Sequence, residues 1–136
     1  MRRAGPVAAL VAAMALGAGC GNRTSPDLFV LERSGTVPGA RLTLRVQDDG
    51  QVGCNGRARR RLPDELLLDA REIARELNRV APRALAPGAR SILTYRLRLE
   101  RGTVRFSDSS RGQTKQMYLA QAFARAVARR VCGLPR

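Results

Sequence analysis

The sequence predicts a small α+β fold, in which a mostly antiparallel sheet carries two helices on one face. Several short segments alternate apolar with polar side chains, which is the period of a half-buried strand. Two longer segments repeat apolar residues at helical spacing. The turns between paired strands are too short for parallel crossovers. The predicted element order is βββ-α-ββ-α, and a chain of 136 residues with 44% apolar residues is long enough for one domain with a buried core.

The first three strands are expected within residues 27–54. Residues 27–33 form a β-prone run that ends at a Ser-Gly turn. Residues 42–46 alternate leucine and valine with Thr43 and Arg45. Asp48-Asp49-Gly50 is typical of a hairpin turn, so residues 51–54 are expected to return antiparallel to the preceding strand.

Two helices and a second hairpin complete the pattern. Pro63 suits the first position of a helix and the acids after it suit the first turn, while Pro82 ends the segment. The apolar stripe of this helix consists of Leu66, Ala70, Ile73, Leu77 and Val80. Residues 93–99 alternate apolar with polar side chains, Gly102 makes a turn, and a final helix is expected over 115–130.

The first twenty residues have the features of an export signal. A basic start, Met1-Arg2-Arg3, precedes a ten-residue apolar segment over 7–16, which is too short to cross a bilayer about 30 Å thick. Gly17-Ala18-Gly19 and Cys20 follow, and this arrangement resembles the lipobox signal of bacterial lipoproteins, although Leu16 stands four places before the cysteine instead of three. An ordinary secretory signal is the alternative.

The lipoprotein resemblance implies a division of the chain. Residues 1–19 would be a cleaved signal peptide, Cys20 would carry the lipid, and residues 20–26 would be a linker of about 20 Å at most. Residues 27–136 would form the single α+β domain on the extracytoplasmic face of the cell membrane, or outside the cell if the signal is an ordinary one. Loss of Arg2 and Arg3 lowers the formal net charge of +14 by two.

Two cysteines remain beyond Cys20. Because exported proteins occupy an oxidising compartment, Cys54 and Cys132 are expected to form one structural disulfide. Two unpaired buried thiols are the alternative.

The basic side chains predict a binding surface. The chain has 25 Lys and Arg residues against 11 Asp and Glu residues. The disulfide would bring together two arginine clusters that follow Cys54 and precede Cys132. The expected patch consists of Arg57, Arg59, Arg60, Arg61, Arg125, Arg129 and Arg130. Scattered surface arginines without a common ligand are the alternative.

The expected partners follow from this charge and from export. The membrane would be contacted through the lipid anchor, and the arginines suit anionic lipid, an anionic wall polymer or an acidic protein. Nucleic acid is not expected, since the protein is exported and its few aromatics are expected in the core. Two further pairs, Arg41/Arg45 and Arg96/Arg98, are expected on the solvated side of the sheet.

Catalysis, metal binding and cofactors are not expected. The sequence has no His, which excludes Ser-His-Asp and Cys-His catalysis and any His-bearing zinc site. Asp108 lies among Ser107, Ser109 and Ser110 in a polar loop, but no base stands nearby in the sequence. The predicted function is therefore a membrane-anchored, non-enzymatic binding module.

A second resemblance concerns the mature domain. Residues 31–35 (Leu-Glu-Arg-Ser-Gly), a turn that contains Gly39 and the alternating strand after it are similar to the opening of emfourin-type inhibitors of thermolysin-like metalloproteases. The usual Gly-Gly-Phe of that opening is Gly35-Thr36-Val37 here. This resemblance implies an inhibitor of an exported metalloprotease, and it places no inhibitory residue.

Overall fold

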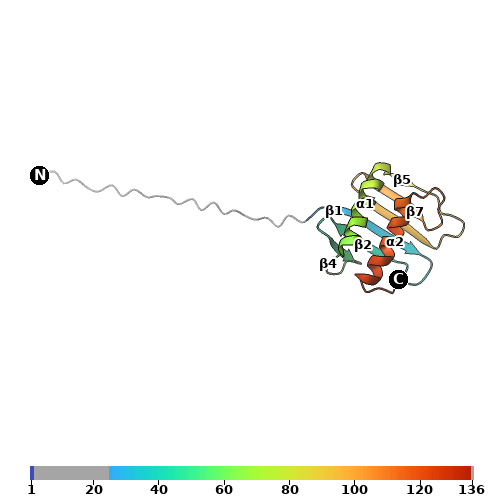
Figure 1. Cartoon of the computed structure of the whole chain (residues 1–136), viewed down its shortest axis with the longest axis horizontal. Coiled ribbons are helices and arrows are strands. Elements are labelled where there is room, and N and C mark those ends of the chain that lie inside the picture. Colours follow the sequence, from blue (N-terminus) through green and yellow to red (C-terminus); the bar gives the residue numbers. More distant parts are fainter. Residues whose placement is uncertain (2–24, 136) are drawn as a thin grey trace.

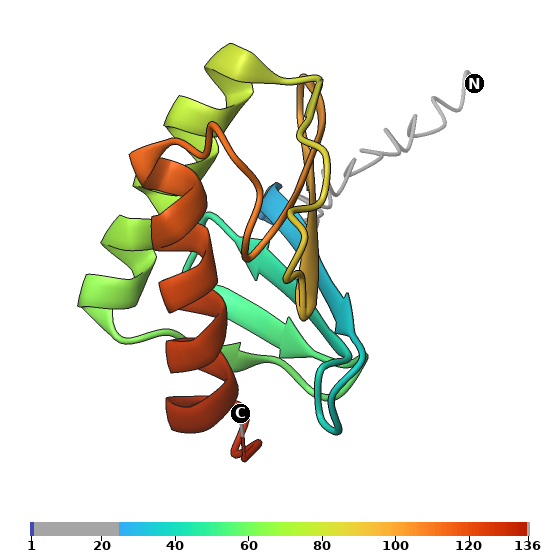
Figure 2. The same cartoon turned by 90° about the vertical axis from the view of Figure 1, so that its right-hand side faces the viewer.

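The protein is a two-layer α+β structure, with a sheet on one side and two helices on the other (Figures 1 and 2). The computed structural model describes Met1 and residues 25–135, so the expected signal peptide and Cys20 lie outside the described residues. Within the described part, the sheet has seven strands in the order β4-β3-β2-β1-β6-β7-β5. In chain order, the elements are β1 (Asp27–Gly35), β2 (Leu42–Gln47), β3 (Gln51–Cys54), β4 (Arg60–Arg61), α1 (Asp64–Val80), β5 (Arg83–Ala84), β6 (Leu93–Leu99), β7 (Gly102–Ser107) and α2 (Lys115–Arg130).

This architecture confirms the predicted fold class. The five longer strands and both helices occur in the predicted order. Two strands of two residues each, β4 and β5, were not predicted from the sequence. β4 pairs antiparallel with β3, and β5 pairs with β7 in the one parallel ladder of the described sheet. Both lie at the edges of the sheet, where short strands limit pairing with other chains.

The central strand β1 pairs antiparallel with β2 on one side and with β6 on the other. The β2–β3 hairpin turns at Gly50, whose φ of +84° is a conformation that glycine adopts without strain. The chain before β1 is also fixed, because the carbonyl of Ser25 accepts a hydrogen bond from Gln47 Nε2 at 3.0 Å. A fragment that begins at Ser25 therefore includes this contact and every element of the described fold.

Both helices bury one face against the same side of the sheet (Figure 2). The buried residues of α1 are Leu66, Ala70, Ile73, Ala74 and Leu77, so Ala74 joins the predicted stripe, while Val80 at its end is only partly buried. In α2, Thr114 caps the N-terminus by accepting a hydrogen bond from the backbone N–H of Met117.

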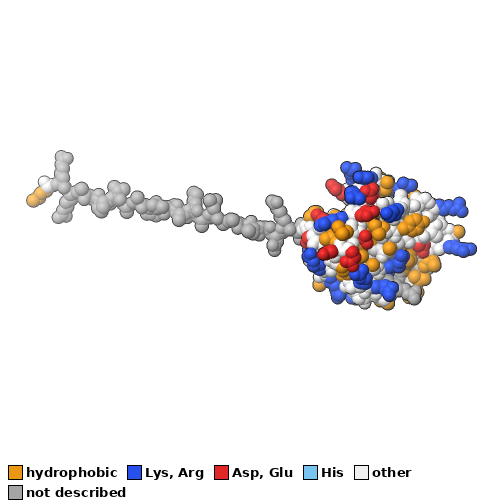
Figure 3. Space-filling model, viewed as in Figure 1, with side chains coloured by type: hydrophobic (Ala, Val, Ile, Leu, Met, Phe, Trp, Pro, Cys, Tyr) orange, Lys and Arg blue, Asp and Glu red, His pale blue; other side chains and the backbone are white. Residues whose placement is uncertain are grey.

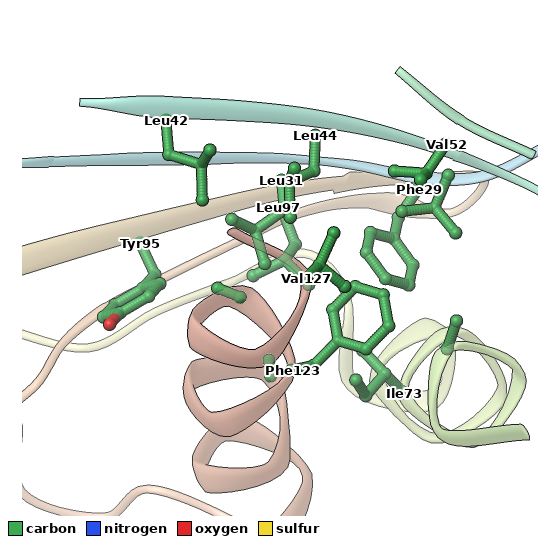
Figure 4. Packing of buried hydrophobic residues seen from close by; sticks show 14 of the residues in the cluster. Phe29, Leu31, Leu42, Leu44, Val52, Ile73, Tyr95, Leu97, Phe123 and Val127 are labelled. Atoms are coloured by element: carbon green, nitrogen blue, oxygen red, sulfur yellow. The ribbon is translucent and has the colours of Figure 1, made fainter. Parts of the chain in front are cut away.

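The core lies between these helices and the sheet. Phe29 of β1 and Phe123 of α2 meet edge to face, with ring centroids 5.8 Å apart (Figure 4). Tyr95 of β6 and Phe106 of β7 stack at 5.3 Å. Because these aromatics are almost fully buried, the contact between Phe29 and Phe123 joins the middle of the sheet to the second helix.

The expected disulfide is present. Cys54 at the end of β3 and Cys132 just beyond α2 are bonded, with their Cα atoms 5.9 Å apart. The bridge closes a long loop, since its ends are 78 positions apart in the sequence. It ties the end of α2 to the β3 side of the sheet.

Replacement of both bridged cysteines, Cys54→Ala with Cys132→Ala, is expected to lower the free energy of unfolding by about 2–4 kcal/mol, because the unfolded chain regains the entropy that the cross-link removes. Urea denaturation of fragment 25–136 measures the change. Reductant should destabilise the parent fragment to a similar extent and leave the double variant unaffected. An unchanged unfolding midpoint in the double variant would contradict a stabilising bridge.

Candidate functional site

The face of the sheet opposite the helices is rich in arginine. Strand side chains that do not point into the core alternate outward to this face, which we call the open face. Two neighbouring hollows of about 350 and 380 Å³ lie along it. Apart from the buried Arg33, the arginines that line these hollows are Arg41, Arg45, Arg57, Arg59, Arg96, Arg98 and Arg105.

The register of the strands sets these arginines in rows. Val30 of β1 lies opposite Arg45 of β2 and opposite Arg98 of β6. In the next row, Arg96 lies between Glu32 of β1 and Arg105 of β7. Side chains directly opposite each other in such pairs have Cβ atoms about 4.5–5.5 Å apart. The guanidinium groups therefore lie on both sides of β1, from β2 on one side and from β6 and β7 on the other, and β1 contributes Val30 and Glu32 between them.

Only part of this positive charge is neutralised. Asp27 forms a two-pronged contact with Arg45, whose Nε lies 3.0 and 2.9 Å from the two carboxylate oxygens. This contact raises the pKa of Arg45, mainly through the hydrogen bond and then through the charge of Asp27. Glu32 lies 3.4 Å from Arg96 and 3.6 Å from Arg98.

Within residues 25–135, the remaining open-face arginines have no side-chain partner. Among the described residues, no ion pair or side-chain hydrogen bond involves Arg41, Arg57, Arg59 or Arg105. These four guanidinium groups are free to bind an external anion.

On the other side of the sheet, helix α1 is rich in acidic residues. Helix α1 carries five of the eleven acidic residues of the chain, and Figure 3 shows acidic side chains over this helix. They are Asp64, Glu65, Asp69, Glu72 and Glu76. Helix α1 thus carries five acids against three arginines, whereas α2 beside it carries one lysine, three arginines and no acid.

The seven arginines that the sequence placed in one patch lie in several surroundings. Arg57 and Arg59 line the first open-face hollow, whereas Arg125 and Arg129 line hollows beside α2. The disulfide does bring β4 to the end of α2, where Arg60 Nη1 donates a hydrogen bond to the carbonyl of Val131 at 2.9 Å.

Two members of that expected patch remain. Arg61 is exposed on the edge strand β4. Arg130 pairs with Glu65 of α1, and the hydrogen bond from Arg130 lowers the pKa of this carboxyl.

The serine-rich loop holds two backbone segments together. The hydroxyl of Ser91 lies 2.6 Å from that of Ser107 and 2.9 Å from that of Ser109. Ser110 donates to the carbonyl of Ala86 at 2.7 Å. The Asp108 carboxylate accepts hydrogen bonds from the backbone N–H groups of residues 92 and 93. The polar side chains of this loop therefore have hydrogen-bond partners among themselves and in the backbone.

Comparisons with models of known protein families, with curated proteins and with solved structures gave no match. The resemblances to lipoprotein signals and to emfourin-type inhibitors therefore stay predictions. No cluster of three or more Cys, Asp or Glu side chains that could hold a metal ion occurs among residues 25–135. Within the same residues, neither helix has the length and apolar character needed to cross a membrane.

Tyr95 of β6 is fully buried, and the positive charges of Arg33 and Arg125 act on it. Burial raises the pKa of Tyr95, and the nearby positive charges of Arg33 and Arg125 only partly oppose this effect. The folded protein therefore holds the phenolic proton more tightly than the unfolded chain does. This contribution to stability is complete below pH 10 and is lost as the pH rises through the raised pKa.

This difference can be measured in a Tyr118→Phe variant, in which Tyr95 is the remaining tyrosine. Tyrosinate absorbance and circular dichroism are followed together as the pH is raised. We expect the absorbance to appear only above pH 10 and to accompany unfolding. Ionisation at or below pH 10 with native circular dichroism would contradict a raised pKa.

Proposed function

We propose that this chain is an exported, lipid-anchored binding protein without catalytic activity, whose open face binds the anionic headgroups of the membrane that holds it. The observation that carries the proposal is the group of four open-face arginines, Arg41, Arg57, Arg59 and Arg105, which lack an acidic partner among the described residues. Each basic side chain near an anionic lipid surface contributes about 1 kcal/mol to binding.

The position of these arginines relative to the expected anchor supports this ligand. The proposed linker joins the domain at Asp27, where β1 begins. Asp27 pairs with Arg45, which lines the same hollow as Arg57, Arg59 and Arg98. Because the linker reaches about 20 Å at most, a lipid at Cys20 would hold this end of the open face close to the headgroups.

The acids of α1, which lie on the other side of the sheet from the open face, support the orientation. With the open face on the membrane, the acids of α1 would point away from the anionic surface and into the aqueous phase. The opposite orientation would bring those acids against headgroups of the same sign. A headgroup layer also suits the shallow form of the open face, since it offers many phosphates in one plane.

We propose a role without catalysis because of the residue types that the sequence contains and the hydrogen bonds of its polar loop. The sequence has no His. Asp108 and the serines beside it are occupied by hydrogen bonds that hold the backbone. A binding role needs only the charged surface.

Lipid binding by the open face can be tested with fragment 25–136, which lacks Cys20 and the apolar signal. Co-sedimentation is measured with vesicles of phosphatidylglycerol and phosphatidylcholine, and with vesicles of phosphatidylcholine alone. We expect binding to the anionic vesicles only. The triple variant Arg57→Gln, Arg59→Gln, Arg105→Gln should bind about 100-fold more weakly, since three basic side chains contribute about 3 kcal/mol.

The matched control removes the same charge from the other side of the domain. It carries Arg71→Gln, Arg75→Gln and Arg79→Gln in α1, and it should keep most of the vesicle affinity. Equal losses in both triple variants would mean that net charge alone drives binding and would overturn the assignment to the open face. If the fragment shows no preference for anionic vesicles, the proposed ligand is wrong. Binding to an anionic wall polymer instead would identify that polymer as the ligand.

Anchoring is tested separately in a bacterial host that processes lipoproteins. The full chain should incorporate labelled fatty acid and fractionate with membranes, whereas Cys20→Ser should lose the label because it lacks the thiol to be acylated. The double variant Cys54→Ala, Cys132→Ala is the control and should remain labelled. An unlabelled wild-type protein in the culture supernatant would contradict the anchor and favour an ordinary secretory signal.

A further inference from the structure

A larger hollow of about 630 Å³ lies at the end of the sheet where β1 finishes. It is formed by the β1–β2 loop, Ile92 with the first residue of β6, Asp108, one side of α2 and Pro135. Its volume is in the range of small-molecule binding sites, about 300–1,000 Å³. The lining residues are Arg33, Val37, Pro38, Gly39, Ala40, Ile92, Leu93, Asp108, Arg125, Arg129 and Pro135.

One wall of this hollow is apolar and accessible. Apart from Met1, four large apolar side chains are exposed among the described residues, and two of them, Val37 and Ile92, line the hollow. Val37 is 43% exposed and Ile92 is 49% exposed. Isolated exposed apolar residues need no explanation, but here they stand with two prolines in one concave surface. Such a wall favours the apolar part of a ligand.

The loop that forms this wall is held in place from below. Arg33 is only 3% exposed, and its Nε donates to the carbonyl of Ala40 at 2.8 Å while its Nη2 donates to that of Gly39 at 3.2 Å. The β1–β2 loop is also hydrogen-bonded to the start of β6, through the N–H of Thr36 and the carbonyl of Ile92. The hollow therefore exists before any ligand binds, which lowers the entropic cost of binding.

A second part of the lining is cationic. Arg125 and Arg129 are one helical turn apart on α2, so their side chains lie on the same face of the helix. Both are exposed, and neither has an ion pair or side-chain hydrogen bond within residues 25–135. The acid of the lining, Asp108, is already bonded to the backbone N–H groups of Ile92 and Leu93. The hollow thus has an excess of positive charge on one side.

We propose that this hollow binds a small amphiphilic acid, with its carboxylate on Arg125 and Arg129 and its aliphatic chain against Val37, Pro38 and Ile92. Guanidinium groups bind carboxylates through paired, charge-assisted hydrogen bonds, and two of them stand at one end of an apolar wall. A ligand with charge and chain at opposite ends matches both walls at once. A purely apolar ligand would leave the two guanidinium groups unused, and a small inorganic anion would leave the apolar wall exposed.

The two arginines proposed to bind the ligand belong to α2, on the other side of the sheet from the open-face arginines, although the hollow and the second open-face hollow both touch the buried Arg33. β1 runs for nine residues from Asp27 to Gly35, which spans about 26 Å at 3.3 Å per residue. The hollow lies at the far end of this strand from the expected linker. Because Arg125 and Arg129 are on the helix side of the sheet, a ligand reaches them without crossing the open face.

The test uses fragment 25–136 and decanoate below its micellar concentration. Binding is measured by calorimetry, and the bound position is found from amide chemical-shift changes. We expect saturable binding, with the largest shifts in the β1–β2 loop, in residues 92–93 and in the C-terminal half of α2. Decanol, which lacks the charge, and butyrate, which lacks most of the chain, should each bind at least tenfold more weakly.

Variants separate the two walls. The pair Arg125→Gln, Arg129→Gln should weaken decanoate at least tenfold and leave decanol unchanged, whereas Ile92→Ser should weaken both ligands. The matched control Arg75→Gln, Arg79→Gln removes two arginines at the same spacing from α1 and should leave decanoate binding unchanged. These side chains are all exposed, and thermal unfolding checks that each variant is folded.

The proposal is overturned if decanoate does not bind, if its shifts lie outside the hollow, or if the Arg125, Arg129 variant binds as the parent does. Vesicle binding gives an independent readout. The Arg125, Arg129 variant should still bind anionic vesicles, and the Arg57, Arg59, Arg105 variant should still bind decanoate. The decanoate result is therefore informative even if the membrane proposal is wrong, and the vesicle result is informative even if the decanoate proposal is wrong.

Discussion

Pairing of β1 with strands on both of its sides is the interaction on which the rest of the structure depends. β2 and β6 are more than forty residues apart in the sequence, and they enter one sheet only because β1 lies between them. The same strand presents Phe29 to Phe123 and so fixes α2 against the middle of the sheet. Arg33, near the end of this strand, is buried and donates hydrogen bonds to carbonyl groups of the β1–β2 loop, which fixes that loop. Sheet, helix layer and loop are thus aligned by one strand.

Covering the sheet on one side only has a consequence for charge. The helices bury the apolar half of every long strand, and the polar half is left in water. Arginine at alternate positions of β2, β6 and β7 therefore gathers on one surface, while the acids of α1 lie on the other side of the core. No buried ion pair is needed for this arrangement, because the paired side chains of the open face stay partly exposed to water. The alternation that builds the core also builds the cationic face.

The local patterns were sufficient to predict the fold, and the long-range ones were not. The alternation in 42–46 and the stripe from Leu66 to Val80 depend on neighbouring residues, so they predict a strand and a helix correctly. β4 and β5 have no such pattern, since each exists only through pairing with a neighbour. The row of Arg45, Val30 and Arg98 depends on the register between strands that are distant in the sequence. The predicted arginine patch depends instead on distance from the two cysteines, and that distance contains no information about strand register. The large hollow depends on a buried arginine, Arg33, whose residue type is usually exposed.

The place where the N-terminal segment joins the domain also determines how the domain bears force. A pull on the chain before Asp27 acts along β1, the central strand, whose hydrogen bonds to β2 and β6 run across the direction of the pull. Both ladders are then loaded in shear, and many bonds must fail together before the strand can leave the sheet. A strand peeled away at right angles to its axis would instead lose its hydrogen bonds one at a time. A domain attached through its central strand is therefore built to resist extraction by tension, independently of its thermodynamic stability.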